Sequence, residues 1–377
     1  LIGSPGEEKV YLYGLDQSEG EWTKINELTN GRDDFGIDVQ LCVNEHGNVY
    51  AVVQDISKVI LFKYQGLTWD SGIVLDSFNT AQAAIEYSVS IDVDDNNNGY
   101  VIIGVYDTPM GPNKECDRVI IKTIRAGSVE RTDTIKPVPD DSSYGFSVAI
   151  DAETDTALIG AQNRHYGDRG ALYVYKKINS EWVNTLEISG STDISDFGEY
   201  ISMDGNRALV ANKGSVLVYE SNGETWVNKY DIPVNIGTLD DVSLDLNGDS
   251  ALIGLSDEGA AYLFKRSGNT WTEEIELTAS DGEAGDEFAY SVACYEETIL
   301  IGAPLYDIEG NNDINNDNEG AAYIFEKNSD DEWEEKQIIT EYEEEGKSKS
   351  LENLLNQKIF SYPLLKTIKD LIKNLLL

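Results

Sequence analysis

The sequence has few of the residues that usually carry chemistry at neutral pH. Among its 377 residues are two histidines, three cysteines and two methionines. Two histidines leave little for imidazole catalysis or a typical zinc site, and three cysteines are too few for a disulfide framework. The chain also lacks a run of 18 apolar residues, so we expect no transmembrane segment.

Positive charge is also scarce. Lysine and arginine together number 28 against 69 acidic residues, which gives a net charge of −41 at pH 7. Because binding to a nucleic-acid backbone depends on cationic side chains, we expect no nucleic-acid partner. The apolar fraction of 41% is sufficient for a packed core and excludes a largely disordered chain.

Internal repeats are the strongest signal in the sequence. A short apolar run returns seven times, and each copy is followed by a run in which apolar residues alternate. The apolar runs are Leu1–Pro5, Tyr50–Gln54, Val101–Val105, Ala157–Ala161, Ala208–Asn212, Ala251–Leu255 and Ile299–Pro304. The alternating runs are Val10–Tyr13, Val59–Phe62, Val119–Lys122, Ala171–Tyr175, Val216–Tyr219, Ala261–Phe264 and Ala322–Phe325. Both patterns are typical of β-strands.

Two further elements complete each unit. In six units the alternating run is followed by a tryptophan, and in the third unit Val129 occupies this place. The tryptophans are Trp22, Trp69, Trp182, Trp226, Trp271 and Trp333. An aromatic or glycine motif then leads into another strand, at Asp34–Gly36, Tyr87–Val89, Tyr144–Val148, Asp196–Gly198, Asp241–Leu244 and Glu287–Val292. Four short strands in each unit of roughly 45–60 residues are typical of a propeller blade. We therefore predict an all-β fold, a seven-bladed β-propeller of four-stranded blades over residues 1–340.

The fourth element is found six times, whereas the other three occur seven times. This count predicts 27 strands and a first blade that lacks one strand. We expect a preceding segment or another chain to supply it.

These units resemble FG-GAP repeats, which form the propellers of integrin α-subunits and of many secreted bacterial and protist proteins. The resemblance covers residues 1–340. Its most specific stretch is 251–325, with Ala251–Gly254, Trp271, Ala279–Gly282, Asp286–Val292, Leu300–Pro304 and Gly320–Phe325. The resemblance implies an extracellular or cell-surface protein that acts in adhesion or assembly through loops at one face.

The resemblance also implies calcium, held in integrin-type repeats by a loop of the form D-x-D-x-D-G-x-x-D. The best match is Asp92, Asp94 and Asn96, although Asn97 replaces the expected glycine and Tyr100 the last aspartate. A second candidate is Asp313, Asn315 and Asp317, which follows Pro304 instead of occupying the family's usual position. Both stretches provide the oxygen ligands that Ca²⁺ requires, and both are equally compatible with solvated turns.

The end of the chain has a different pattern. Residues 341–350 are predicted to be a charged linker, and residues 351–377 an amphipathic helical tail interrupted at Pro363. Its apolar stripe consists of Leu351, Leu354, Leu355, Ile359, Leu365, Ile368, Leu371, Ile372, Leu375 and Leu376. From residue 346 onward the net charge is +4, opposite to that of residues 1–340. The stripe is expected to dock either on its own propeller or on another protein subunit.

No catalytic constellation is apparent, because neither His46 nor His165 can be assigned to a serine or cysteine nucleophile. We therefore expect a non-enzymatic interaction module, a structural subunit of a larger complex or filament. Two alternatives remain. With 21 tyrosines and six tryptophans, the propeller is a candidate for carbohydrate binding, in which case its partners are glycans. The less favoured alternative is a hydrolase or lyase carried on a propeller.

Overall fold

The computed structural model describes residues 1–340, apart from several loops. The loops left out are 5–7, 17–19, 30–34, 37, 45, 56, 66–67, 78–84, 108–117, 137–140, 165–168, 191–196, 213, 235, 237–241, 284 and 307–319. The predicted linker and helical tail lie outside the described residues, so the tail stays a prediction. The described part has one short helix, the 3₁₀ turn η2 (Ser256–Glu258), and none that is long and apolar enough to cross a membrane.

All seven apolar runs form strands, and six of them lie between two other strands of their sheet; the exception is β1, which is at the edge of its sheet among the described residues. They are β1 (Ile2–Ser4), β5 (Val49–Asp55), β10 (Gly99–Asp107), β14 (Thr156–Arg164), β18 (Arg207–Asn212), β22 (Ser250–Leu255) and β26 (Thr298–Ala303). In β10, for example, Ile102 and Ile103 are fully buried although they are consecutive. Successive side chains point to opposite faces of a strand, so both faces of β10 are covered by other elements.

The alternating runs and the tryptophan elements form the next strands. The alternating runs give β2 (Lys9–Asp16), β6 (Lys58–Gln65), β11 (Arg118–Arg125), β15 (Arg169–Ile178), β19 (Ser215–Ser221), β23 (Ala260–Ser267) and β27 (Ala321–Lys327). The outer strands that follow are β3 (Glu21–Thr29), β7 (Thr68–Trp69), β8 (Ile73–Ser77), β12 (Ser128–Ile135), β16 (Glu181–Ser189), β20 (Trp226–Ile232), β24 (Thr270–Leu277) and β28 (Trp333–Thr340).

The fourth element forms the first strand of the following sheet. These first strands are β4 (Val39–Val43), β9 (Ile85–Val93), β13 (Asp141–Asp151), β17 (Ile201–Asp204), β21 (Val242–Asn247) and β25 (Ser291–Tyr295). Each pairs with the apolar strand after it in antiparallel fashion, so that the sheet order is, for example, β9-β10-β11-β12. The sheet β1-β2-β3 has three strands among the described residues.

The described residues form 28 strands where the sequence predicts 27, because the outer strand of the second sheet is divided. Between β7 and β8, the Asp70 carboxylate accepts hydrogen bonds from the backbone N–H groups of Lys63 at 3.1 Å and Gly72 at 3.0 Å. Gly72 has a φ of +72°, a conformation that favours glycine. This turn interrupts the strand, and β8 resumes the pairing with β6.

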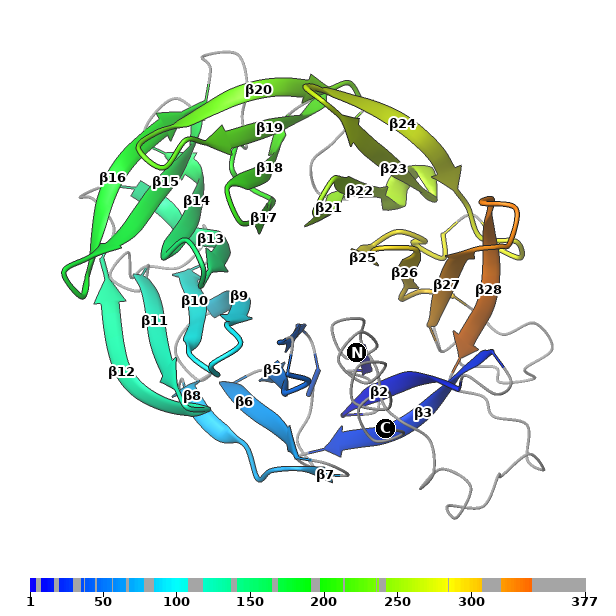
Figure 1. The fold of residues 1–377 in the computed structure, drawn as a ribbon, viewed down its shortest axis with the longest axis horizontal. Helices are drawn as coiled ribbons and strands as arrows, with labels where there is room; N and C mark the ends of the chain where they lie inside the picture. The colour runs from blue at the N-terminus through cyan, green and yellow to red at the C-terminus, as the bar shows by residue number, and fades with distance from the viewer. Residues whose placement is uncertain are drawn as a thin grey trace, which may run out of the picture. The chain divides into compact units, whose positions relative to one another are not determined.

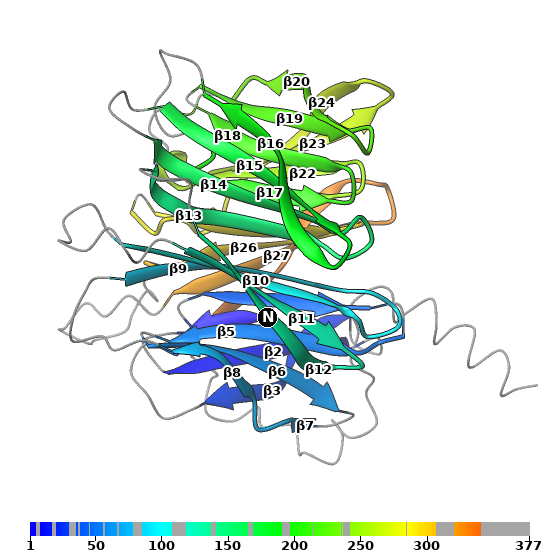
Figure 2. The same cartoon turned by 90° about the vertical axis from the view of Figure 1, so that its left-hand side faces the viewer.

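Consecutive four-stranded antiparallel sheets of this kind are propeller blades, so the prediction of a seven-bladed β-propeller is confirmed. The described residues divide into two compact units, 1–167 with 171–188, and 168–170 with 189–340. Within each unit, neighbouring sheets meet through their first strands: β9 contacts both β4 and β13, and β21 contacts both β17 and β25 (Figure 1). The strands of each sheet run antiparallel and twist (Figure 2).

Candidate functional site

The predicted calcium residues Asp94 and Asn96 lie in the tight turn between β9 and β10. The carboxylate Oδ1 of Asp94 accepts the backbone N–H groups of Asn96 at 2.9 Å and Asn98 at 2.8 Å. The Asp94 backbone N–H also donates to the Asn98 carbonyl at 2.7 Å, and Asn97 has a φ of +59°. The Asp94 side chain therefore holds the turn in the way that aspartates commonly do.

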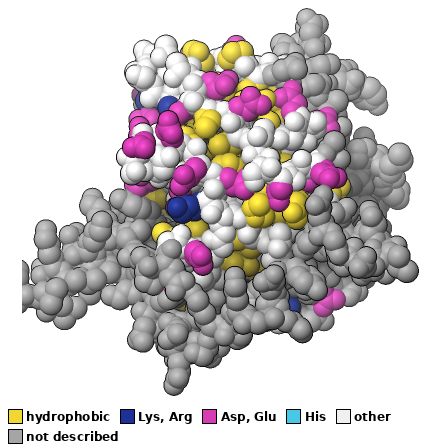
Figure 3. Space-filling model, turned by 90° about the vertical axis from the view of Figure 1, so that its right-hand side faces the viewer, with side chains coloured by type: hydrophobic (Ala, Val, Ile, Leu, Met, Phe, Trp, Pro, Cys, Tyr) yellow, Lys and Arg dark blue, Asp and Glu magenta, His cyan; other side chains and the backbone are white. Residues whose placement is uncertain are grey.

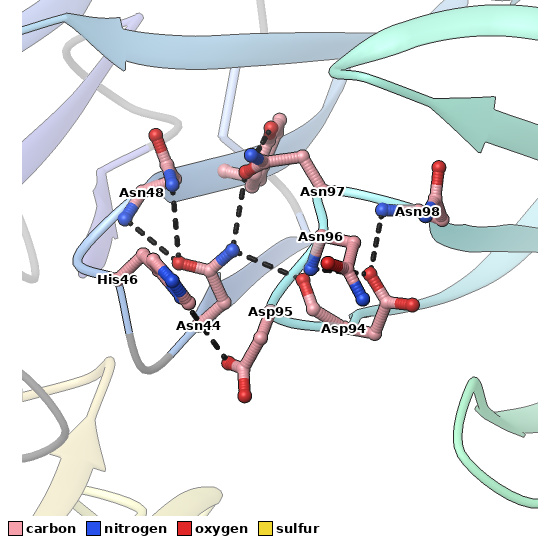
Figure 4. A network of polar contacts seen from close by, with 9 residues as sticks. Asn44, His46, Asn48, Asp94, Asp95, Asn96, Asn97 and Asn98 are labelled. Carbon is pink, nitrogen blue, oxygen red and sulfur yellow. Dashed lines mark hydrogen bonds and ion pairs between the residues drawn. The ribbon is translucent and has the colours of Figure 1, made fainter.

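This turn packs against the β4–β5 turn of the preceding sheet, as Figure 4 shows. The Asn44 amide Nδ2 donates to the Asp94 carbonyl at 3.0 Å and to Asn97 Oδ1 at 3.1 Å. The Tyr50 hydroxyl donates to the same Asn97 Oδ1 at 3.1 Å. Asn44 is 4% exposed, and its own Oδ1 accepts the backbone N–H of Asn48. A network of asparagines thus joins two neighbouring turns.

The third predicted ligand, Asp92, contacts the sheets on both sides of its own. Its Oδ2 accepts the backbone N–H of Ala152 at 2.7 Å, and its Oδ1 lies 3.8 Å from the Cys42 thiol. Burial, which disfavours the ionised form, raises the pKa of Asp92 to about 6. The Asp92 carboxylate therefore binds the β13 side, whereas the Asp94 carboxylate binds its own turn.

Calcium binding by Asp92, Asp94 and Asn96 stays a prediction. Calcium needs six to eight oxygens that converge on one point, and the Asp92 and Asp94 carboxylates are engaged with separate backbone amides. Within the described part of the chain, no group of three or more His, Cys, Asp or Glu side chains could hold a metal ion. Asp313, Asn315 and Asp317 lie outside the described residues, so calcium binding there stays a prediction.

The predicted assembly tail is also outside the described residues. This applies to every residue of its stripe, namely Leu351, Leu354, Leu355, Ile359, Leu365, Ile368, Leu371, Ile372, Leu375 and Leu376.

The Asp92–Ala152 bond belongs to a repeated arrangement, which we call a seam: the contact between the first strands of two neighbouring sheets. Between β17 and β21, the Ser202 hydroxyl accepts the Leu246 N–H at 3.0 Å and the Asp204 carboxylate accepts the Gly248 N–H at 2.6 Å. Between β21 and β25, Asp245 accepts the Cys294 N–H at 2.7 Å.

The other seam contacts follow the same rule. Asp38 accepts a backbone hydrogen bond from Val89 in β9. The hydroxyls of Ser88 and Ser243 each donate, at 2.9 Å, to a backbone carbonyl at the start of the next first strand, Gly145 and Ala289 respectively. A first strand pairs within its sheet on one edge only, and the preceding sheet supplies partners for the other edge.

Sequence reasoning did not find the seams, although the signal was present. Serine and aspartate occur at alternate positions of the first strands, as in Ser88, Asp92, Ser202, Asp204, Ser243 and Asp245. Alternate residues of a strand share one face, so such a pattern places several hydrogen-bonding groups toward one neighbour. For Asp92, the seam contact is a second role that this pattern indicates, beside the predicted calcium binding.

Two cysteines accompany the seam aspartates. Cys42 in β4 lies beside Asp92, and Cys294 in β25 lies beside Asp245. Burial, reinforced by the neighbouring carboxylate, raises the pKa of both thiols well above its ordinary value. Both thiols are free and stay protonated at neutral pH, which makes them poor nucleophiles and poor metal ligands.

Comparisons with known proteins agree with this architecture. Residues 271–325, which extend from β24 to β27, match the family model described as the FG-GAP repeat. No curated protein matches the chain. A solved structure described as a functionally unknown protein from Desulfotomaculum acetoxidans DSM 771 is similar, with a TM-score of 0.54 and 15% identity; the match covers 90% of this chain and 97% of that one. At this identity, the similarity concerns the fold alone.

Proposed function

We propose that this β-propeller with an FG-GAP repeat is a non-enzymatic interaction module and a structural subunit of a larger assembly. The proposal places it outside the cell or at the cell surface, where FG-GAP repeats are common. Its partners are other protein subunits, including copies of itself, bound through the propeller surface and the C-terminal tail.

The observation that carries the proposal is an exposed apolar pair on an outer strand. Ile73 is 41% exposed and Val74 is 50% exposed, both in β8. Because successive side chains of a strand point to opposite faces, β8 is uncovered on both faces at this point. Among the described strands β8 pairs only with β6, so its outer edge also offers backbone hydrogen-bonding groups. Exposed apolar edge strands of this kind favour the addition of a strand from a partner.

Charge supports the same proposal. Acidic side chains are spread over the face shown in Figure 3, with few basic ones among them. The outer strand β24 contributes exposed Glu273, Glu274 lies beside it, and β28 contributes Glu335. Such a surface repels a second copy unless a cationic segment intervenes, and the lysine-rich tail has the opposite charge. The tail of one copy is therefore a suitable partner for the acidic surface of another.

Light scattering after size exclusion tests the proposal with the full chain. We expect the wild-type mass to exceed that of a monomer and to rise with concentration. The double substitution Ile73→Thr and Val74→Thr keeps β-branched side chains and removes apolar surface, so the mass should fall toward the monomer. The substitution Ile368→Asp interrupts the predicted tail stripe and should have the same effect.

A matched control is Val227→Thr, which changes an exposed valine on another outer strand, β20. We expect this variant to assemble like the wild type. A wild-type protein that remains monomeric at every concentration would contradict self-assembly. Equal losses in all three variants would contradict the assignment to β8 and the tail.

A further inference from the structure

The first sheet has an open edge at a place where each of the other sheets has a strand. Among the described residues β1 pairs with β2 alone, whereas the corresponding strands of the other six sheets lie between two partners. The β1 backbone nevertheless lies close against the second sheet, since a Cβ on Gly3 would overlap the Gly36 carbonyl oxygen and lie 3.3 Å from Val39 Cγ1. The receiving side of a seam is therefore present here without a described first strand that binds to it.

Two complete seams show which hydroxyl group the open edge lacks. In the third sheet Ser88 faces Gly104 across the β9–β10 pair, and a Cβ on Gly104 would overlap the Gly145 carbonyl of the next sheet. The Ser88 hydroxyl lies in the remaining space and donates to that carbonyl at 2.9 Å. The sixth sheet repeats this arrangement with Ser243, Gly254 and Ala289. Gly36 holds the position of Gly145, and its carbonyl has no such serine partner among the described residues.

The seam between β21 and β25 contains a second contact that fixes the register. Two residues after its serine, Asp245 accepts the backbone N–H of Cys294 at 2.7 Å, and Cys294 lies five residues after the carbonyl that the serine binds. The same count from Gly36 leads to Leu41 in β4. Leu41 packs against the same apolar cluster as Leu1, which directly precedes β1. An aspartate at the open edge, two residues after a serine that faces Gly3, is therefore in register with the Leu41 N–H.

We propose that the open edge of β1 binds one extended segment of a partner, antiparallel to β1, in which a serine faces Gly3 and an aspartate two residues later faces Leu1. The serine hydroxyl donates to the Gly36 carbonyl, and the aspartate accepts the Leu41 N–H. Apolar residues separate and follow these two, as in Val242–Asn247 of β21, because alternate side chains of a strand face opposite sides.

Backbone hydrogen bonds to β1 supply affinity in this mode of binding, and the serine and the aspartate supply specificity. The edge is part of the first sheet, whereas β8 belongs to the second. The site is therefore separate from β8 and from the tail, and the two proposals can fail independently.

Addition of a strand in register tests the proposal with the full chain. Residues 242–251, which comprise β21 and its turn, are fused directly before Leu1, so that the added Ser243 faces Gly3 as it faces Gly254 in its own sheet. We expect hydrogen exchange at the Leu41 amide to slow by at least about tenfold, because the amide gains a charge-assisted hydrogen bond. The Cys294 amide, which already has its aspartate, serves as the unchanged reference.

Substitutions in the added strand alone separate the two contacts. Asp245→Ala should return exchange at Leu41 toward that of the unfused chain. Ser243→Ala should reduce the rise in urea midpoint that the fusion produces, since the Gly36 carbonyl loses its donor. The matched control Asp249→Ala changes an exposed residue of the added turn and should leave both readouts intact.

A blocked peptide with the sequence of residues 242–247, added to the unfused chain, gives the same readout in trans and decides the question if the fused chain does not fold. We expect this peptide to slow exchange at Leu41, and a peptide with alanine at both polar positions to have no effect. Protection by both peptides alike would overturn the proposal. So would a Leu41 amide as protected as Cys294 in the unfused chain, because another segment, such as the tail, would then fill the edge.

Discussion

Replacing Gly104 with alanine should lower the free energy of unfolding by more than about 3 kcal/mol, because the new methyl group meets the backbone of the next sheet. Gly104 lies in β10, directly against the irregular part of β13, where the register shifts between Tyr144 and Val148. A Cβ at this position would lie 2.9 Å from the Gly145 carbonyl carbon and closer still to its oxygen and to the Ser88 hydroxyl. The Gly145 backbone has a φ of +91°, and it belongs to a paired strand, so it cannot easily move away.

The appropriate control is Gly268→Ala. Unlike Gly104, Gly268 has a left-handed backbone, with a φ of +65°, and no atom lies within 4 Å of its would-be Cβ. This substitution should cost about 1 kcal/mol, from backbone strain alone. Urea denaturation followed by tryptophan fluorescence measures both variants. Similar losses for the two substitutions would contradict the close approach of the β10 and β13 backbones.

Truncation of Tyr323 to alanine should cost about 4 kcal/mol, the amount typical of a large aromatic residue in a core. Tyr323 is fully buried in β27, and its ring lies 5.1 Å from that of Phe288, at 75°. Its hydroxyl donates to Asp281 Oδ1 at 2.9 Å, and Tyr306 donates to the other carboxylate oxygen at 2.9 Å. Tyr323 therefore joins β27 to the loop that precedes β25, inside the region that matches the FG-GAP repeat.

A second substitution separates packing from hydrogen bonding. Tyr323→Phe keeps the ring and leaves Asp281 with its bond from Tyr306, so the expected loss is about 1 kcal/mol. Thermal and urea unfolding of both variants provide the measurement. If Tyr323→Phe were as damaging as Tyr323→Ala, the hydroxyl would be the dominant contribution, and the packing of the ring against Phe288 would not account for the stability of this region.

Periodicity alone was enough to predict the strands, because blade strands bury both faces or alternate faces in a regular way. The seven apolar runs, the alternating runs and the tryptophan elements all lie in strands at the expected places. The division of the outer strand of the second sheet was missed. The division depends on Asp70, which accepts two backbone N–H groups, and on Gly72, which has a positive φ. These hydrogen bonds favour a turn over a continuous strand, and hydrophobic periodicity does not detect them.

The candidate site was harder to predict, because an aspartate on a strand edge has several possible partners. The spacing of Asp92, Asp94 and Asn96 suggested converging ligands, yet Asp92 belongs to a strand and Asp94 to a turn. The serine and aspartate residues that repeat in the first strands indicate the seam contacts. They could be interpreted in this way only once the structure placed the first strands of neighbouring sheets against one another.

The central claim is that side chains of one first strand bind the free backbone edge of the next. Amide-resolved hydrogen exchange of the full chain tests it most directly. We expect the amides of Ala152, Leu246 and Gly248 to be protected, because each donates to a side chain of the preceding sheet. The outward-facing amides of the outer strand β24 should exchange faster, because β24 pairs within its sheet with β23 alone among the described strands. Equal exchange at both edges of the sheets would contradict the claim.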